Sequence, residues 1–320
     1  MASLAERKAL ADQLASEYGI SETTAAASVE ERARVASEVA RQLATSTSSS
    51  PSTVEAAAPS ALPNALECRS EIVARVGQQI AFFLDYDGTL TPIVEDPSAA
   101  VLDNNAGCRD VLRRLSAVRS VAIVSGRSCD KLRAFLQLDG LHLAGSHGLD
   151  IRGPEALSML HPQVEAARGT LEAAARALDA KLNALPGYST EDNVFCISAH
   201  YRMVAAADRE LVHAAVRAVL AAHPGLTHKT GKMVHELRPA VEWDKGKAVA
   251  WLRDQLGGAA VAPIYIGDDV ADEDALAYVE SVGGVGIKVS AEANPTTAAS
   301  VVLRDPSEVR DFLAAFVPPQ

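Results

Sequence analysis

A short run of apolar residues that ends in two aspartates constrains this chain more than any other feature. Residues 80–87 read I-A-F-F-L-D-Y-D, and Gly88 follows them. An apolar run without polar alternation predicts a parallel strand that is buried on both faces. Open α/β sheets bind ligands outside the carboxyl ends of their strands, so Asp85 and Asp87 are expected to lie at a binding site.

The order of strand-like and helix-like segments extends this prediction to a fold class. Further strands are expected over 121–126, 141–146, 263–269, 285–289 and 300–303. Helices are expected between them, over 105–118, 128–136, 244–256, 272–281 and 306–316. Strands that alternate with helices of about 10–15 residues are typical of a doubly wound parallel sheet.

The middle of the chain follows a different pattern. Helices are expected over 163–183 and 208–222, with strand-like runs over 193–203 and 226–239 that carry charged residues on one face. This pattern favours a small α+β domain with one open sheet face. We therefore predict an α/β core of residues 67–149 and 240–320, interrupted by a cap of residues 150–239.

Residues 1–66 form a separate segment in this prediction. Residues 1–43 show apolar positions at helical spacing, and 45–66 are rich in Ser, Pro and Ala. The first pattern predicts amphipathic helices and the second a flexible linker. Two possibilities stay open: helices that pack or self-associate through residues 1–43, or a largely disordered appendage.

Charge and cysteine content limit the partners and the compartment. The 320 residues include 30 Lys and Arg against 41 Asp and Glu, a formal net charge of −11. This acidic balance argues against nucleic acid or an anionic membrane as the main partner. No apolar run approaches the ~18 residues of a membrane span. Four widely spaced cysteines are expected to be reduced thiols, which favours a cytoplasmic protein without a secretory signal.

Acidic residues at two strand ends predict a metal site. Asp85 and Asp87 would repel each other, and a bare pair would raise the pKa of one of them. Asp268 and Asp269 end another predicted strand and are expected to converge on the first pair. A divalent cation removes this conflict, and hard oxygen ligands favour Mg²⁺. For D-x-D alone, the alternative is a polar strand end whose aspartates cap a helix.

Two more segments at the same sheet edge carry groups suited to an anion. Ser125, Gly126 and Arg127 offer a hydroxyl, a backbone N–H and a helix start, although S-G-R is also a common turn. Lys245 begins a predicted helix, where its ammonium group can neutralise a bound phosphoryl group. For Asp272, the ordinary explanation is that an acidic residue stabilises a helix N-terminus.

The predicted cap strands carry polar residues, and the alternation of side chains along a strand places several of them on the same face. Glu191 is expected to share a face with Asn193, and His200 with Arg202. A second group comprises Lys232, Val234 and Glu236. Neutral sugars are recognised by fixed carboxylate, amide and ammonium groups, because each hydroxyl is both a donor and an acceptor. The alternative is a solvated strand face with weak surface ion pairs.

The motifs D-Y-D-G-T, S-G-R, D-K-G-K and G-D-D together resemble the haloacid dehalogenase superfamily of phosphotransferases. The resemblance implies phosphoryl transfer through an aspartyl phosphate on Asp85, with Asp87 as the acid and then the base. Ser125 and Lys245 would hold the transferring oxygens. The Mg²⁺ ligands would be the Asp85 carboxylate, the Asp87 carbonyl and Asp268, with Asp269 and Asp272 near its water shell.

Residues 75–316 resemble a narrower group, the trehalose-6-phosphate phosphatases. The similarity rests on G-S-H-G at 145–148, the E-D-N segment, K-M-V-H-E-L-R-P, W-D-K-G-K-A and the D-E-D-A end of the G-D-D motif. It implies hydrolysis of trehalose 6-phosphate, a small-molecule partner. It also implies sugar contacts by Glu191, Arg202, Lys232 and Glu236, with His147 at the cap hinge. Two departures are Asn193, where the group usually has Lys, and Ala271, where it usually has Thr.

Three other functions remain open at this point. The same chemistry could serve another substrate, such as sucrose phosphate or a mannosyl-phosphoglycerate. A non-catalytic sensor of a sugar phosphate would be expected to carry a degraded acidic site. A phospho-receiver domain would need neither the D-x-D-G-T string nor a cap of ~90 residues.

Overall fold

A computed structural model describes residues 62–292 and 295–318 of the chain. The helices predicted within residues 1–43, and most of the predicted linker, lie outside these residues. The end of the linker prediction is wrong, because Asn64 forms a β-bridge with Val302 and Ala65 is fully buried. The ordered core therefore begins several residues earlier than the composition indicates.

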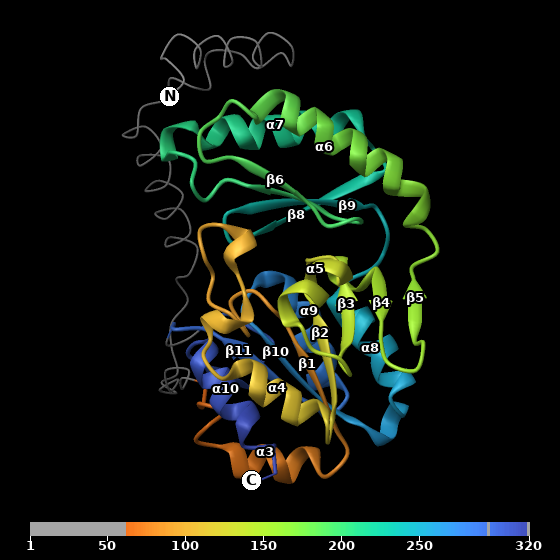
Figure 1. The fold of residues 1–320 in the computed structure, drawn as a ribbon, viewed down its shortest axis with the longest axis vertical. Coiled ribbons are helices and arrows are strands. Elements are labelled where there is room, and N and C mark those ends of the chain that lie inside the picture. The colour runs from red at the N-terminus through yellow and green to blue at the C-terminus, as the bar shows by residue number, and fades with distance from the viewer. Residues whose placement is uncertain (1–61, 293–294, 319–320) are drawn as a thin grey trace, which may run out of the picture. The chain divides into compact units, whose positions relative to one another are not determined.

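The core is built on one large sheet, which has eight strands among the described residues (Figure 1). Its order is β12-β11-β10-β1-β2-β3-β4-β5, and the first six of these run parallel. The parallel strands are β1 (Ile80–Leu84), β2 (Ser120–Val124), β3 (His142–Gly145), β10 (Ala262–Gly267), β11 (Val285–Val289) and β12 (Val301–Leu303).

Helices cover both faces of this sheet, which confirms the predicted α/β fold of the doubly wound type. Phe82 and Leu84 of β1 pack in one apolar cluster, and Ala81 and Phe83 in another, because side chains alternate along a strand. The first cluster includes α3 (Arg69–Val76), α4 (Cys108–Ser116), α5 (Cys129–Leu136) and α10 (Pro306–Ala314). The second includes α8 (Lys245–Gln255) and α9 (Glu273–Ser281).

Two strands at the edge of the large sheet come from the region predicted as cap. β4 (Asp150–Arg152) pairs antiparallel with β3, and β5 (Ser158–Leu160) pairs antiparallel with β4. The chain therefore leaves the core after residue 160, not at residue 150. The sequence pattern placed the boundary too early because these strands have only three residues each, too few to show a period.

The second sheet has four strands within the described part of the chain, in the order β6-β7-β9-β8, all antiparallel. They are β6 (Ser189–Asp192), β7 (Ile197–His200), β8 (Leu226–Gly231) and β9 (Val234–Pro239). Two helices, α6 (Arg168–Leu182) and α7 (Arg209–Ala222), bury their apolar sides on one face of this sheet. The opposite face looks towards the core (Figure 1). We call this sheet with its two helices the cap.

One strand prediction within the cap is wrong. Residues 193–203 do not form one strand, because a tight turn separates β6 from β7. The Asp192 carboxylate accepts a hydrogen bond from Val194 N at 2.7 Å, and Asn193 N donates to Cys196 O at 2.9 Å. Asn193 therefore lies in a hairpin turn and not on the same strand face as Glu191.

Short 3-10 helices complete the described chain. They span Pro97–Ala99, Leu102–Asn104, Ser146–Gly148, Glu165–Ala167, Ala206–Asp208, Gly258–Ala260 and Val270–Asp272. Within the residues that the structure describes, every helix is too short or too polar to cross a lipid bilayer.

Candidate active site

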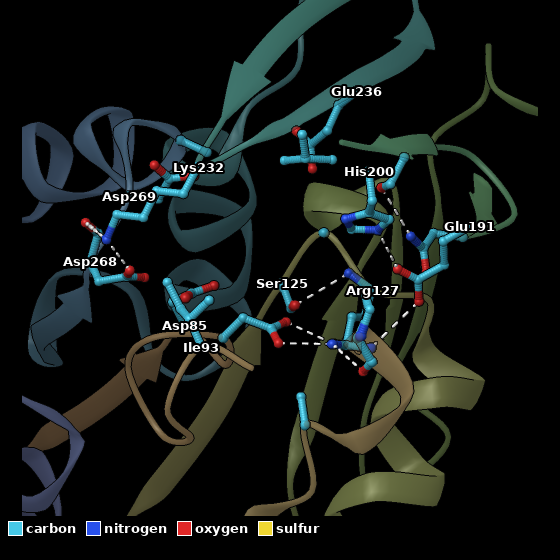
Figure 2. Close-up of a pocket in the computed structure, with 18 of the residues that line it drawn as sticks. Asp85, Ile93, Ser125, Arg127, Glu191, His200, Lys232, Glu236, Asp268 and Asp269 are labelled. Atoms are coloured by element: carbon cyan, nitrogen blue, oxygen red, sulfur yellow. Dashed lines mark hydrogen bonds and ion pairs between the residues drawn. The ribbon is translucent and has the colours of Figure 1, made fainter. Parts of the chain in front are cut away.

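A cleft lies between the carboxyl ends of the core strands and the open face of the cap sheet (Figure 2). It contains about 840 Å³ of space, including the part open to solvent. All the predicted site residues except Asp272 line this cleft. They are Asp85, Asp87, Ser125, Gly126, Arg127, His147, Glu191, Asn193, Arg202, Lys232, Glu236, Lys245, Asp268 and Asp269.

The first strand and the G-D-D segment meet at the core end of the cleft. Asp85 N donates to Ile266 O of β10 at 2.9 Å, so the two strand ends stay in register. Gly88 allows the close approach: its φ is +83°, and a Cβ there would lie 2.2 Å from an Asp268 carboxylate oxygen. Oxygens of Asp85, Asp268 and Asp272 consequently lie within 4.8 Å of one another. The structure therefore brings the two predicted acidic segments together.

A buried lysine connects two of these carboxylates. Lys245 Nζ donates to Asp85 Oδ1 and to Asp272 Oδ1, each at 2.6 Å. Tyr265 Oη donates to the same Asp272 oxygen at 2.6 Å, and Asp269 N donates to the other oxygen. Both oxygens of Asp272 are thus occupied. The sequence analysis missed Tyr265. This residue lies within the apolar strand β10, and its hydrogen bond to Asp272 is evident only in the folded structure.

Burial and crowding set the protonation of the acidic residues. Burial raises the pKa of Asp85 well above its usual value, and the neighbouring Asp272 and Asp268 add to this despite Lys245. Burial and Asp272 raise the pKa of Asp268 to about 6. Burial would also raise the pKa of Asp272, but the hydrogen bonds from Lys245 and Tyr265 lower it instead.

These features fit a hard divalent cation better than an empty carboxylate pair. The oxygens of Asp85 and Asp268 offer hard, partly unused lone pairs at short distance, and two anionic groups that resist ionisation together are stabilised by added positive charge. Asp272 belongs to the same group, but it already accepts three hydrogen bonds, two at one oxygen and one at the other, so it has less capacity left for an ion.

Asp87 lies after the end of β1 and is held by an arginine. Arg127 donates from Nε and Nη2 to the two Asp87 oxygens, at 2.7 and 2.8 Å. The same guanidinium donates to Pro97 O at 2.9 Å and lies over the ring of Phe135. Arg127 was predicted to bind an anion, but these contacts already occupy its Nε and Nη2 donors. Its place in this structure is beside Asp87.

The loop after β2 brings the core close to the cap. Ser125 Oγ accepts a hydrogen bond from Arg127 N at 3.2 Å. A Cβ at Gly126 would lie 2.8 Å from His147 Nε2 and 3.1 Å from a Glu236 oxygen, so only glycine fits without displacing them. The loop after β2 therefore packs directly against the His147 and Glu236 side chains.

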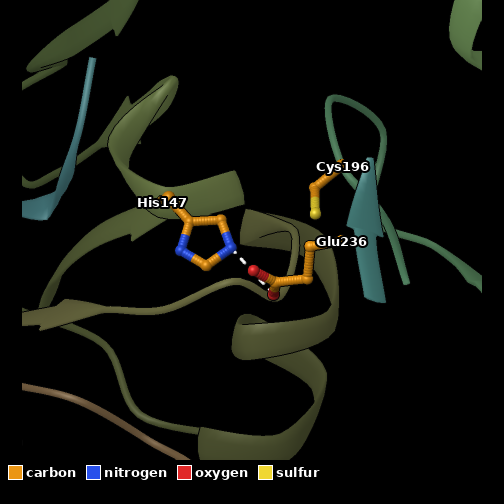
Figure 3. A group of neighbouring side chains, drawn as sticks. All are labelled: His147, Cys196 and Glu236. Atoms are coloured by element: carbon orange, nitrogen blue, oxygen red, sulfur yellow. Dashed lines mark hydrogen bonds and ion pairs between the residues drawn. The ribbon is translucent and has the colours of Figure 1, made fainter. Parts of the chain in front are cut away.

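Buried His147 pairs with the largely buried side chain of Glu236, and both line the cleft (Figure 3). His147 Nε2 lies 3.0 Å from Glu236 Oε1, and Arg238 contacts the second Glu236 oxygen. Burial and Arg238 lower the pKa of His147 to about 4. Burial opposes ionisation of Glu236, but His147 and Arg238 outweigh it and hold its pKa well below the usual value.

Cys196 completes a group of potential metal donors with this pair (Figure 3). Burial raises the pKa of its thiol above the usual range, so it stays protonated at neutral pH. Arg238 already neutralises Glu236 at this position. A second cation would meet a guanidinium and a thiol, and we conclude that this group is not a metal site.

At the other side of the cleft, three basic side chains hold the Glu191 carboxylate. His200 Nε2 lies 3.1 Å from Oε2, and Lys131 Nζ and Arg127 Nη1 lie 3.0 and 3.4 Å from Oε1. Burial alone would raise the pKa of Glu191, but these three groups lower it to about 2. Glu191 is therefore a carboxylate with a fixed orientation.

Arg202 and Lys232 lie in turns of the cap. β7 ends at His200, so Arg202 does not share its strand face as predicted; it follows in the next turn. Arg202 donates to Val94 O at 2.6 Å and to Lys232 O at 2.9 Å. Lys232, in the turn between β8 and β9, contacts Asp268 through its ammonium group. The cap turn thus reaches the acidic group of the core.

The structure adds lining residues that the motifs did not indicate. An apolar wall of the cleft comes from Ile93, Val94, Pro97 and Ala100, shortly after the D-x-D-G-T segment. The sequence P-I-V, which follows the D-Y-D-G-T-L-T motif, was the only sign of this wall. Apolar residues in a loop show no regular spacing, so the pattern could not assign them to a site.

Comparisons with known proteins support one family. The trehalose-phosphatase family profile matches residues 83–307. The chain is 44% identical over 258 residues to trehalose 6-phosphate phosphatase RA3 of Zea mays, covering 76% of this chain and 71% of that protein. It is 38% identical over 268 residues to trehalose-phosphate phosphatase B of Arabidopsis thaliana, covering 80% and 71%.

A solved structure agrees on the fold. The C-terminal domain of the Candida albicans trehalose-6-phosphate phosphatase superposes with a TM-score of 0.69 at 20% identity, covering 81% of this chain and 99% of that one. The family profile and the two plant relatives, each spanning most of this chain, show that it belongs to the trehalose-phosphatase family.

Proposed function

We propose that this protein hydrolyses trehalose 6-phosphate to trehalose and phosphate, as a step of trehalose synthesis. The observation that carries the proposal is the two-sided cleft. Asp85, Asp268 and Lys245 stand at its core end, and Glu191 and Glu236 stand fixed and ionised on its other walls. One end offers phosphoryl chemistry and the other offers hydrogen bonds to sugar hydroxyls.

In the first step, Asp85 is the nucleophile. Its carboxylate oxygen forms a bond to phosphorus while the bond from phosphorus to the sugar oxygen breaks. Asp87, protonated for this step, gives its proton to the leaving oxygen, so that a neutral sugar departs. Ser125 and Lys245 hold the oxygens of the transferring group, where negative charge builds up.

In the second step, water removes the phosphoryl group from Asp85. The Asp87 carboxylate takes a proton from this water, whose oxygen bonds to phosphorus as the bond to Asp85 breaks. Arg127 orients the ionised Asp87 for this second step through its two hydrogen bonds, and a protonated Asp87 in the first step would give up one of them. Its role in this proposal is to position the acid and base, not to bind substrate.

We propose Mg²⁺ as the cofactor, held by the carboxylates of Asp85 and Asp268 and the carbonyl of Asp87, with Asp269 nearby. The ion offsets the repulsion between the nucleophile and a phosphate dianion. Asp272, predicted near the ion, mainly holds Lys245 in our proposal, because three of its acceptor sites take hydrogen bonds from Lys245, Tyr265 and Asp269 N.

For the sugar, we propose contacts from fixed polar groups of the cap. Glu191, Glu236 and Asn193 are candidates because each lines the cleft with a defined orientation. Arg202 and Lys232 would close the cleft from the cap turns. His147 would hold Glu236, in place of the hinge role that the sequence suggested.

The same reasoning supports the proposed domain division and location. We propose a core of residues 67–149 and 240–320 with a substrate-reading cap between them, adjusted so that Asn64, Ala65, β4 and β5 belong to the core. All four cysteines are free thiols, which supports the proposed cytoplasmic location.

A substrate panel tests the proposed function. Phosphate release is measured with trehalose 6-phosphate, sucrose phosphate, mannosyl-phosphoglycerate and p-nitrophenyl phosphate, with Mg²⁺ and again after EDTA. We expect trehalose 6-phosphate to give the highest kcat/KM, by at least about tenfold, since fixed donors and acceptors discriminate strongly among hydroxyl patterns.

Each outcome is informative. A higher kcat/KM for another sugar phosphate would replace the proposed substrate but keep the chemistry. No turnover of any phosphate ester would favour a sensor. Activity that persists in EDTA would contradict the metal assignment.

A further inference from the structure

Lys131, a residue of core helix α5, reaches across the cleft edge to the cap. Its ammonium group donates to Glu191 Oε1 at 3.0 Å, to Asp192 O at 2.5 Å and to Asn193 Oδ1 at 3.0 Å. An ammonium group has three hydrogens, so these three acceptors use all of them. All three belong to the end of β6 and the turn that follows it, which leads to β7.

The three contacts fix the two polar side chains that this turn presents to the cleft. Glu191 and Asn193 both line the cleft, whereas Lys131 does not. The Asn193 amide nitrogen donates to Ser198 Oγ at 3.3 Å, which leaves its oxygen directed at Lys131. Lys131 therefore fixes the orientation of the Asn193 amide and the position of the Glu191 carboxylate.

A second lysine offers a comparison, because it also joins cap to core. Lys229 of β8 lies 3.3 Å from Asp274 of α9, with side chains that are 45% and 47% exposed. Lys131 and Glu191 are 33% and 19% exposed, and Lys131 has three partners. Neither Lys229 nor Asp274 lines the cleft. Exposed single pairs of this kind contribute little, whereas a partly buried three-way contact holds a geometry.

We propose that Lys131 is a positioning residue for substrate recognition: from the core, it holds Glu191 and Asn193 of the cap in the geometry that binds the sugar part of the substrate. This inference rests on the proposed function. It gives helix α5, which follows the S-G-R loop, a role in recognising the sugar through Lys131.

Lysine-to-methionine variants test the proposal, since methionine keeps an unbranched side chain without the charge. For Lys131→Met we expect the KM for trehalose 6-phosphate to rise about 10- to 50-fold, with kcat within about threefold of wild type. The kcat/KM for p-nitrophenyl phosphate, which has no sugar, should change less than about twofold. Lys229→Met is the matched control and should leave both substrates unchanged.

A conservative variant separates positioning from a general loss of structure. Lys131→Arg restores a cation with several donors. Its KM for trehalose 6-phosphate should return most of the way to the wild-type value. Melting temperatures of all three variants are measured in parallel. Similar melting temperatures for the two methionine variants, with only Lys131→Met impaired on the sugar substrate, would support the proposal.

Two results would overturn it. An equal loss of kcat/KM on both substrates would mean that Lys131 acts on chemistry or folding. An unchanged KM for the sugar substrate in Lys131→Met would mean that the turn holds its shape without it. If wild type prefers another sugar phosphate, the proposed function fails but the test stands, with that ester in place of trehalose 6-phosphate.

Discussion

The two ends of the cleft are built from different kinds of backbone. At the core end, Asp85 and Asp268 follow neighbouring parallel strands, and the strand register brings them together. At the cap end, Asn193, Arg202 and Lys232 lie in turns, and their partners come from elsewhere in the chain. A strand end places a side chain through the sheet, whereas a turn places it through its individual contacts.

This difference suggests a division of labour. The core end is shared by any phosphate ester, because its groups contact the phosphoryl part. The cap end should matter only for a substrate that carries a sugar. Variants at the two ends should therefore differ in which substrates they impair.

The largest effect is expected at the core end. Asp85→Asn should lower kcat by about 10⁴-fold or more on trehalose 6-phosphate and on p-nitrophenyl phosphate alike, because the amide cannot act as the nucleophile. Phosphate release under saturating substrate measures it. Asp150→Asn is the control, since Asp150 is a buried carboxylate that pairs with Arg152 outside the cleft. Turnover by a folded Asp85→Asn protein would break the comparison.

A smaller and selective effect is expected at the cap end. Glu236→Gln should lower kcat/KM for trehalose 6-phosphate by about 30- to 100-fold, because glutamine has one acceptor oxygen in place of two and lacks the charge that Arg238 holds in position. The value for p-nitrophenyl phosphate should fall by less than about threefold. Glu308→Gln serves as the control, because Glu308 is a buried glutamate that pairs with Arg304 away from the cleft. Equal losses on both substrates would remove the proposed division.

The smallest effect concerns stability and pH. The folded pKa of His147 lies near 4, below its unfolded value, so the unfolded chain binds a proton first as pH falls. Because of His147, the free energy of unfolding should fall by about 2 kcal/mol as the pH drops from 7 to 5. The pKa of Glu191 near 2 adds losses only below about pH 4.5, because its folded value is lowered. Buried His235, with a pKa of about 4, contributes in the same direction as His147.

Urea unfolding at the two pH values measures this dependence. His147→Gln should show a smaller fall in unfolding free energy than wild type, since glutamine does not titrate. Equal falls in both proteins would mean that other groups control the pH response of the cap end.

The sequence predicted the core end well because its signals are local. An apolar run predicts a buried strand, and residues at strand ends in a parallel sheet share one edge, so Asp85 and Asp268 followed from pattern alone. The strand itself ended earlier than expected, at Leu84, but the edge was the same. Family resemblance then supplied the chemistry.

The cap end was predicted less well, for a physical reason. Alternation assigns a face only within a strand, and the turn at Asn193 broke the strand that the pattern assumed. Arg202 contacts Val94, 108 positions away, and Lys131 contacts residues about 60 positions away. No local period encodes such pairs. Tyr265 was missed in the same way, because its partner Asp272 is defined by the fold of the G-D-D loop.

The contact between Lys232 and Asp268 has one further consequence. The tip of a cap hairpin touches the same acidic residue that we assign to the magnesium ion. An ion at that oxygen must share it with the lysine or displace it, so ion affinity and hairpin position are thermodynamically linked. Such linkage is reciprocal: whatever draws the hairpin away strengthens the hold on the ion, and a tightly held ion makes the hairpin easier to lift.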